Sequence, residues 1–373
     1  MPVLQSLQSL QSLQSLQSLQ SLQSLQSLQS LQSLQSLGAQ PAASPVGYIT
    51  AHDGIAGLWQ GSAAANPRNI ADPASLGLWG AQSQQIVLSN EMLSRLSYGT
   101  DPDSGAAVVY LLDQTDPSGT SPQLTAAPLV QMVAPTPEDF AAQARMVSDY
   151  ADLRPDRISE ITDQTAGTIG YYAHITGLEA PRHPATLKLL MLAQDCATHA
   201  AQQCKHILAC HRPVALSPQI HPIIPTPTHS SLPSGHATEA FAVASLLSRL
   251  ATAAPGTDTQ LMHMAARIAV NRTIAGVHFP ADSFAGAVLG MAISDAIAAR
   301  AGQEDTVQPL RFNGAGIGTE DFFTTRVWHD GARQLPVTSD GVAITEQLPG
   351  TAGTDLSPLL ARVWTDAVAE WTL

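Results

Sequence analysis

Helix-forming segments, separated by short breaks that contain proline or glycine, run from about residue 136 to residue 301. The first begins with Thr136, Pro137 and two acidic residues, a pattern typical of a helix N-terminus, and extends to about residue 153. Further helices are predicted at 157–165, 184–210, 237–253, 260–275 and 279–301. The proline-rich stretch 213–232 cannot form a regular helix. The sequence therefore predicts a mainly α fold with a helical bundle at its core.

The segments on either side of this bundle are less regular. Residues 4–36 are eleven copies of Leu-Gln-Ser, and a period of three forms no stable apolar face on a helix. We therefore expect residues 1–37 to be a disordered low-complexity segment. Residues 38–130 and 306–373 are predicted as irregular N- and C-terminal extensions, with one helix each at 82–96 and 357–371, around a catalytic core at 131–305.

The composition of the chain argues against some classes of binding partner. The net charge of −13 argues against a nucleic-acid partner and against docking on an anionic membrane. No apolar run reaches the ~18 residues of a membrane span, and no secretory signal is visible. We expect a soluble protein, cytoplasmic by default.

The three cysteines lack the spacing of a disulfide framework, and a zinc site at Cys204, His206, Cys210 and His211 is disfavoured because a helix would splay these ligands.

A first block of chemically informative residues lies at the end of the helix predicted over 184–210. Lys205 and Arg212 are seven positions apart, so two helical turns would place both cations on one face. Pro213 would then end the helix with Arg212 at its rim. Lys205 is one of only two lysines in the chain, which makes it unlike routine surface decoration.

A second block, Pro-Ser-Gly-His at 233–236, comes directly before the helix predicted over 237–253. A helix N-terminus offers free N–H donors and partial positive charge to an anion. Gly235 would let the anion approach the backbone, and Ser234 adds a hydroxyl group. His236 would then stand beside the anion as a proton donor or acceptor.

A third block spans Arg272 to Asp282. His278 and Asp282 are four positions apart, so the carboxylate can hold one ring nitrogen and make the other a better nucleophile or metal ligand. Arg272 precedes a bend at Gly276 and adds a planar cation for oxyanion oxygens. Each block alone is typical of a solvated face, a turn or a surface pair. All three in this order favour a single pocket for an oxyanion such as phosphate or vanadate.

These blocks resemble the K-x6-R-P, P-S-G-H and S-R-x5-H-x3-D motifs of the type 2 phosphatidic acid phosphatase (PAP2) and vanadium haloperoxidase superfamily, over residues 205–282. One position departs, since Asn271 stands where the family has serine. The resemblance implies a helical-bundle fold in which His278 bonds the central atom, Asp282 orients it and His236 is the acid/base. It also implies oxyanion contacts from the remaining motif residues: Lys205, Arg212, Ser234, Gly235 and Arg272.

The resemblance leaves two reactions open. The first is a haloperoxidase that oxidises bromide or iodide with hydrogen peroxide at a vanadate held by His278, and for this reaction the resemblance suggests a homo-oligomer. His229, where bromo- and iodoperoxidases carry a second histidine, and the missing membrane spans favour this reaction, although His229 is also typical of a loop residue that caps nearby backbone. The second is a soluble acid phosphatase that acts on phosphate esters through a phosphohistidine at His278 and needs no cofactor.

The compact arrangement of the blocks favours the phosphatase. Only 36 positions separate His236 from Arg272, and Leu232 replaces an aromatic residue that often precedes Pro-Ser-Gly-His. On balance the sequence gives the haloperoxidase a small preference. A non-enzymatic anion-binding protein is the third class, and it is disfavoured because binding alone needs no oriented nucleophile.

Overall fold

The structure is a computed structural model that describes residues 49–50, 72–114, 123–251 and 257–372. The Leu-Gln-Ser repeat, which we expected to be disordered, lies outside these residues. The chain divides into two compact units, Met1–Val87 and Leu88–Leu373. In the first unit, the 3-10 helix η2 covers Pro73–Leu78, and the helix α3 (Ala81–Leu93) begins there and continues into the second unit.

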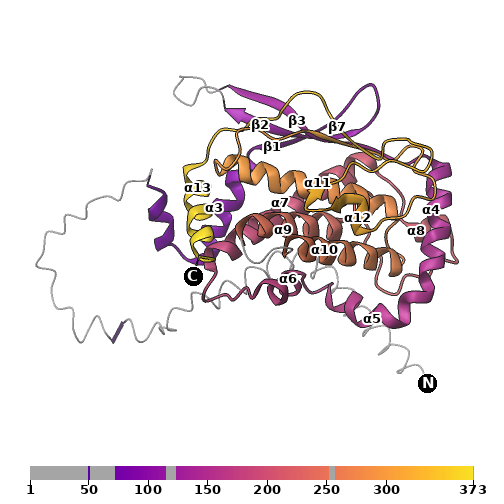
Figure 1. Cartoon of the computed structure of the whole chain (residues 1–373), viewed down its shortest axis with the longest axis horizontal. Helices are drawn as coiled ribbons and strands as arrows, with labels where there is room; N and C mark the ends of the chain where they lie inside the picture. The colour runs from indigo at the N-terminus through magenta and orange to yellow at the C-terminus, as the bar shows by residue number, and fades with distance from the viewer. Residues whose placement is uncertain (1–48, 51–71, 115–122, 252–256, 373) are drawn as a thin grey trace, which may run out of the picture. The chain divides into compact units, whose positions relative to one another are not determined.

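The second unit contains the predicted helical core (Figure 1). Its longer helices are α4 (Pro137–Asp149), α5 (Arg154–Asp163), α6 (Ile169–Thr176), α7 (Pro184–Leu208), α9 (Gly235–Leu250), α10 (Thr257–Ile274), α11 (Pro280–Arg300) and α13 (Pro358–Ala369). Shorter helical turns are η3 (Tyr150–Leu153), α8 (Pro213–Leu216) and α12 (Thr324–Val327). The mainly α class is therefore confirmed, and α6 is a helix that the sequence did not predict.

Helix α11 forms the centre of this unit, and every one of its residues is buried. The sequence predicted no segment long and apolar enough to span a membrane, but α11 is one such helix among the described residues. Its surface is covered by protein. Helix α9 packs against α7, α10 and α11. The approach of α9 to α11 requires glycine, because a Cβ atom on Gly286 would lie 2.7 Å from Ala237 Cβ and 2.9 Å from the Ser234 carbonyl oxygen.

The two extensions, which we predicted to be irregular, also contribute strands to one sheet. Its strands are arranged in the order β1 (Leu96–Thr100), β2 (Ala107–Gln114), β3 (Leu124–Val133), β4 (Leu310–Asn313) and β7 (Thr345–Gln347). Neighbours are antiparallel except for β3 and β4, which are parallel. Strands of this sheet contact α7 and α11. A separate two-stranded ribbon joins β5 (Trp328–His329) to β6 (Ala332–Arg333).

The packing of α9 on α11 brings the starts of these two helices together. The backbone N–H of Ser234, which caps α9, donates to the carbonyl oxygen of Asp282 in the first turn of α11 at 2.9 Å. This backbone hydrogen bond joins the second and third sequence blocks, independently of their side chains.

Candidate active site

The first sequence block lies where α7 ends. Lys205, in the last turn of the helix, has only 1% of its surface exposed, and its Nζ donates to the carbonyl oxygens of Ser230 at 2.9 Å and Ser231 at 2.6 Å. Burial and the charge of Arg212 lower the pKa of Lys205 to about 7. Both hydrogen-bond acceptors of Lys205 among the described residues are neutral carbonyl oxygens. No carboxylate bonded to the amine therefore neutralises its positive charge there.

Arg212 does not share a helical face with Lys205, so that detail of the prediction is wrong. The helix ends at Leu208 because Ala209 adopts a left-handed conformation with φ of 50°, and Arg212 follows in extended backbone as the cap of α8. From there Arg212 Nε donates to the His229 carbonyl oxygen at 3.1 Å, and Nη1 donates to the Val277 carbonyl oxygen at 2.8 Å. The two cations still converge, since both charges act with burial to lower the pKa of His278.

A hydrogen-bonded chain of three side chains holds His278. Asp282 Oδ2 lies 2.8 Å from His278 Nδ1 and accepts the Ser231 hydroxyl at 2.5 Å. The same oxygen accepts the backbone N–H of Phe279 at 3.0 Å. The predicted His278–Asp282 pair therefore forms in the structure, and Ser231 is a third member that the sequence analysis did not identify.

The contacts of His278 assign its tautomer. Arg212 Nη1 lies 3.1 Å from His278 Nε2, and a guanidinium group can only donate, so Nε2 accepts and carries no proton. Nδ1 then carries the proton and donates it to Asp282. Burial, followed by the charges of Arg212 and Lys205, holds the pKa of His278 well below its usual value, so the ring is neutral. The lone pair of His278 Nε2 therefore points at the guanidinium group of Arg212, and an anion bound to this guanidinium would lie beside Nε2.

The second block forms the N-terminus of α9 as predicted. The Ser234 hydroxyl is fully buried and accepts the backbone N–H of Ala237 at 3.4 Å, so it caps the helix. Gly235 has open space at the Cβ position, where the nearest atom is Glu239 Oε1 at 4.0 Å. An anion can therefore reach the first free N–H groups of the helix without meeting a side chain.

His236 follows Gly235 and lies among the cations. Burial and then the charge of Arg272, with smaller effects from Lys205 and Arg212, lower the pKa of His236 to about 3. The ring is therefore neutral while these charges are uncompensated. Because a bound oxyanion would offset the positive charges, it would raise the pKa of His236 and restore a proton that the ring could donate.

Arg272 provides the most direct sign of an anion site. Its side chain is 1% exposed, and its Nη2 donates to Gln164 Oε1 at 2.7 Å and to the Ile161 carbonyl oxygen at 3.2 Å. Its Nε and Nη1 have no hydrogen-bond partner among the described residues. A buried guanidinium with two unmet donors costs on the order of a few kcal/mol unless a ligand satisfies it. These donors fit an oxyanion of the phosphate or vanadate kind.

His229 lies in the same cluster, but it faces Arg212. Its Nδ1 is 3.1 Å from Arg212 Nη2 and 3.2 Å from the Ser230 carbonyl oxygen. Burial and the charges of Lys205 and Arg212 lower the pKa of His229 to about 4, so the ring is neutral. In this structure His229 supports Arg212 through both its ring and its backbone carbonyl.

Two further polar residues near the site were missed by the sequence analysis. Gln164, directly after α5, is fully buried against Arg272. Glu239 lies one turn after His236 on α9, and its Oε1 accepts the Thr198 hydroxyl at 2.8 Å. Burial raises the pKa of Glu239 to about 7. Neither residue belongs to a recognisable motif, and only the fold places them beside the second and third blocks.

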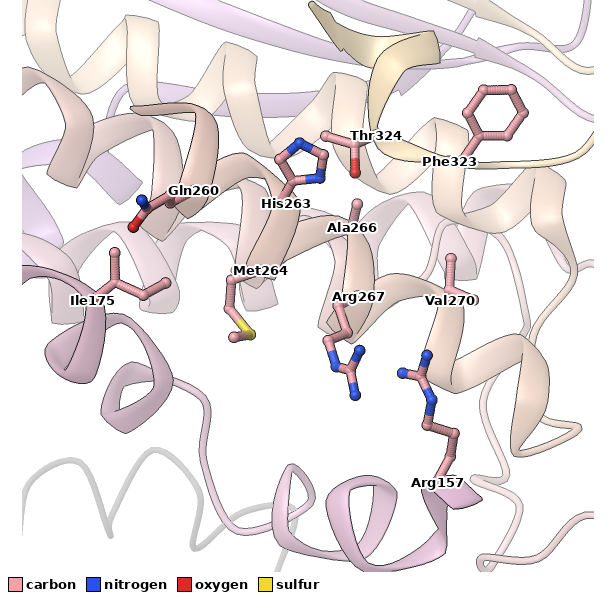
Figure 2. A pocket seen from close by; sticks show the side chains of 10 residues that line it. All are labelled: Arg157, Ile175, Gln260, His263, Met264, Ala266, Arg267, Val270, Phe323 and Thr324. Carbon is pink, nitrogen blue, oxygen red and sulfur yellow. The ribbon is translucent and has the colours of Figure 1, made fainter. Parts of the chain in front are cut away.

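An open groove of about 630 Å³ runs along α10, and its walls are mainly apolar (Figure 2). None of the predicted site residues lines it. Figure 2 shows the guanidinium groups of Arg157 and Arg267 close to each other at one end of this groove. Both arginines pair with Glu160, at 3.7 Å for Arg157 and 2.7 Å for Arg267, so their charge is already partly balanced.

Comparisons with known proteins relate part of the chain to one family. Residues 185–302 match the family model described as the PAP2 superfamily, and this span contains all the predicted site residues. Among solved structures, the chain is similar to the first transmembrane PAP2 type phosphatidylglycerolphosphate phosphatase from Bacillus subtilis. That match has 20% identity and a TM-score of 0.35, and it covers 43% of this chain and 84% of the other. No curated protein matches the chain.

Proposed function

We propose that this chain, which carries a PAP2 superfamily domain over residues 185–302, hydrolyses phosphate monoesters through a phosphohistidine at His278. The observation that supports it is the chain from Ser231 through Asp282 to His278, which leaves a neutral ring with an unprotonated Nε2. This reverses the order of preference drawn from the sequence. His229, which favoured the haloperoxidase, contacts Arg212 and so has a role in either reaction.

In the first step the monoester displaces Arg212 from His278 Nε2, and the guanidinium moves its donor to a phosphate oxygen. Arg272 offers its unmet Nε and Nη1 donors to the same group. The Nε2 lone pair forms a bond to phosphorus while the bond from phosphorus to the ester oxygen breaks. His236 gives a proton to the leaving alcohol, and Asp282 stabilises the positive charge that develops on the His278 ring.

In the second step the role of His236 in proton transfer reverses. His236, now neutral, takes a proton from a water molecule whose oxygen attacks phosphorus. The bond from phosphorus to Nε2 breaks, its electron pair returns to His278, and inorganic phosphate leaves. The cations and the free N–H groups of α9 stabilise the negative charge on the phosphoryl oxygens in both steps, which is the main demand of phosphoryl transfer.

The test measures hydrolysis of p-nitrophenyl phosphate and, in parallel, of bis-p-nitrophenyl phosphate. We expect release of nitrophenol from the monoester only, and acid-labile, alkali-stable label on the protein after quenching with a ³²P-labelled monoester. His278→Ala should abolish both signals. Turnover that persists in His278→Ala, or a wild-type protein that neither turns over nor becomes labelled, would contradict the proposal.

Vanadate-dependent haloperoxidase activity is the second candidate, and the unmet donors of Arg272 support it equally. Lys205, Arg212 and Arg272 would hold the vanadate oxygens, with His278 Nε2 as the ligand of vanadium. Bound vanadate would supply a Lewis acid that activates peroxide toward bromide or iodide. Protein loaded with orthovanadate should be assayed with peroxide and each halide. Halide oxidation without phosphatase turnover in the vanadate-free protein would replace the first proposal with this one.

A further inference from the structure

Gln164 contacts two of the proposed active-site side chains from one buried position. Its Oε1 accepts Arg272 Nη2 at 2.7 Å. Its backbone also acts on the His236 ring, whose pKa it raises against the lowering by burial. The side chain that binds the anion and the ring that moves the proton are thus both fixed on the residue that follows α5.

The other contacts of Gln164 fix the direction of its amide. Its Nε2 donates to Glu160 Oε1 at 3.1 Å, one turn earlier, while its Oε1 also accepts Asn271 Nδ2 at 3.1 Å. Asn271 Nδ2 donates to Glu160 Oε1 as well, at 2.9 Å. The asparagine that departs from the family motif is therefore part of this network, and the amide oxygen of Gln164 must face Arg272.

The carboxylate in this network, that of Glu160, forms its ion pair with an arginine other than Arg272. Glu160 makes a two-point pair with Arg267, with both distances at 2.7 Å. Arg267 lines the groove in Figure 2, which contains none of the proposed active-site residues. Arg272 thus donates to an amide oxygen and a backbone carbonyl oxygen, both neutral, and to no carboxylate among the described residues.

We propose that Gln164 is a positioning residue that holds Arg272 and His236 in place without neutralising Arg272. This inference rests on the proposed oxyanion chemistry. A glutamate at position 164 could accept the same hydrogen bond, but it would give Arg272 a permanent counter-ion and compete with the bound anion. The amide of Gln164 orients Arg272 as a carboxylate would. Because the amide is neutral, the positive charge of Arg272 remains available to attract the anion.

Exchanging the side chains at positions 160 and 164 provides a matched test. The double variant Glu160→Gln/Gln164→Glu keeps the net charge, the number of acceptors and the contact between the two side chains, but moves the carboxylate onto Arg272. Isothermal titration calorimetry with inorganic phosphate should show binding weakened about tenfold or more, at an unchanged melting temperature. A purely structural role for Gln164 predicts no change, so affinity within twofold of wild type would overturn the inference.

The single variant Glu160→Gln gives a second measurement that leaves residue 164 intact. Burial lowers the pKa of Arg272 to about 10, and the charge of Glu160 opposes this effect from a distance. Removal of that charge should leave phosphate affinity equal to wild type or up to about fivefold tighter. Weaker binding would contradict the inference.

Both measurements report binding rather than turnover, which separates this inference from the proposed function. A wild-type protein that binds phosphate but hydrolyses no monoester would refute the proposed function, while the two affinities would still decide the role of Gln164.

Discussion

Arg212 Nη1 lies 3.1 Å from His278 Nε2, the ring nitrogen that we propose attacks phosphorus. Arg212 thus partners the unprotonated Nε2 of His278, the proposed nucleophile, while no anion is bound. Both groups need a different partner in the complex, since Nε2 would bond phosphorus and Arg212 would bond an oxygen. Ligand binding is therefore an exchange of partners within a preformed cluster, and the carbonyl oxygens of His229 and Val277 keep Arg212 in place during it.

Asp282→Asn separates the charge of this carboxylate from its geometry. One oxygen, Oδ2, accepts from Ser231, His278 and Phe279, whereas Oδ1 has no partner among the described residues. An asparagine carbonyl oxygen can replace Oδ2 and keep the tautomer of His278. The substitution removes the negative charge that would stabilise the phosphorylated ring and places the new amide Nδ2 at the buried position of Oδ1. The value of kcat should therefore fall about 10²- to 10³-fold.

The measurement for Asp282→Asn is kcat with p-nitrophenyl phosphate, together with the inhibition constant of inorganic phosphate. Phosphate affinity should change much less than kcat, because the anion contacts remain. Ser231→Ala is the matched comparison, since it removes one donor to Asp282 and leaves the charge. A kcat for Asp282→Asn within threefold of wild type would show that Asp282 does not stabilise the ring during catalysis.

Stability should fall in acid because the fold keeps three histidines neutral. The pKa is about 3 for His236, about 4 for His229 and well below the ordinary value for His278. Unfolded histidine titrates near pH 6.5, so below that pH the unfolded chain binds more protons. Each such histidine then costs about 1.4 kcal/mol per pH unit, until the pH reaches its folded pKa. Glu239, whose pKa is raised to about 7, takes up its proton at a higher pH in the fold than in the unfolded chain and offsets part of this loss.

Urea unfolding at pH 7.5 and pH 5.5 measures this dependence. The anion-free protein should be less stable at pH 5.5, and added phosphate should reduce the difference because it compensates the cations that lower the histidine pKa values. The variant His229→Gln/His236→Gln should show a shallower dependence on pH than wild type. An equal slope in the two proteins would mean that these rings are not held neutral in the fold.

The sequence predicted the site better than its surroundings. The contact between His278 and Asp282, four positions apart on one helix start, was foreseeable from local spacing. The contacts of Lys205 and Arg212 are with residues far along the chain, so their spacing of seven positions did not predict them. Ser231 was missed because its carbonyl and hydroxyl contacts cross from a loop to α7 and α11. The sheet was missed for a similar reason. The parallel pairing of β3 with β4 joins strands far apart in the chain, and no local pattern encodes that pairing.

Gly286→Ala tests whether the contact between α9 and α11 positions the site. The new methyl group would lie 2.7 Å from Ala237 Cβ and 2.9 Å from the Ser234 carbonyl oxygen, so the two helices must separate. We expect a loss of about 1–3 kcal/mol in the free energy of unfolding, as for overpacked cores. Activity of the folded fraction should also fall, because Ser234 and Asp282 are bonded across this contact.

Gly170→Ala is the control for that substitution. Gly170 lies in α6 with no atom within 4 Å of its Cβ position, so alanine should stabilise the protein by up to about 1 kcal/mol. Chemical denaturation measures both variants, and p-nitrophenyl phosphate turnover reports on the site. Equal stability of the two variants would show that the helices can separate without cost.

Glu370→Gln tests how the C-terminal helix supports the helix that carries Lys205. Glu370 follows α13, and its carboxylate accepts the backbone N–H groups of Ala185 at 2.7 Å and Thr186 at 2.9 Å, as well as the Thr186 hydroxyl at 2.8 Å. It therefore satisfies free donors and complements the positive end of α7. Because glutamine keeps one acceptor but loses the charge, the free energy of unfolding should fall by about 1 kcal/mol.

The exposed control for Glu370→Gln is Asp366→Asn on α13. It should cost less than about 0.5 kcal/mol, because it breaks only a surface pair with Arg362. Urea denaturation of both variants decides the point. Equal losses would mean that the Glu370 carboxylate adds nothing beyond an ordinary surface charge, and that α7 is held at this end by the packing of α13 alone.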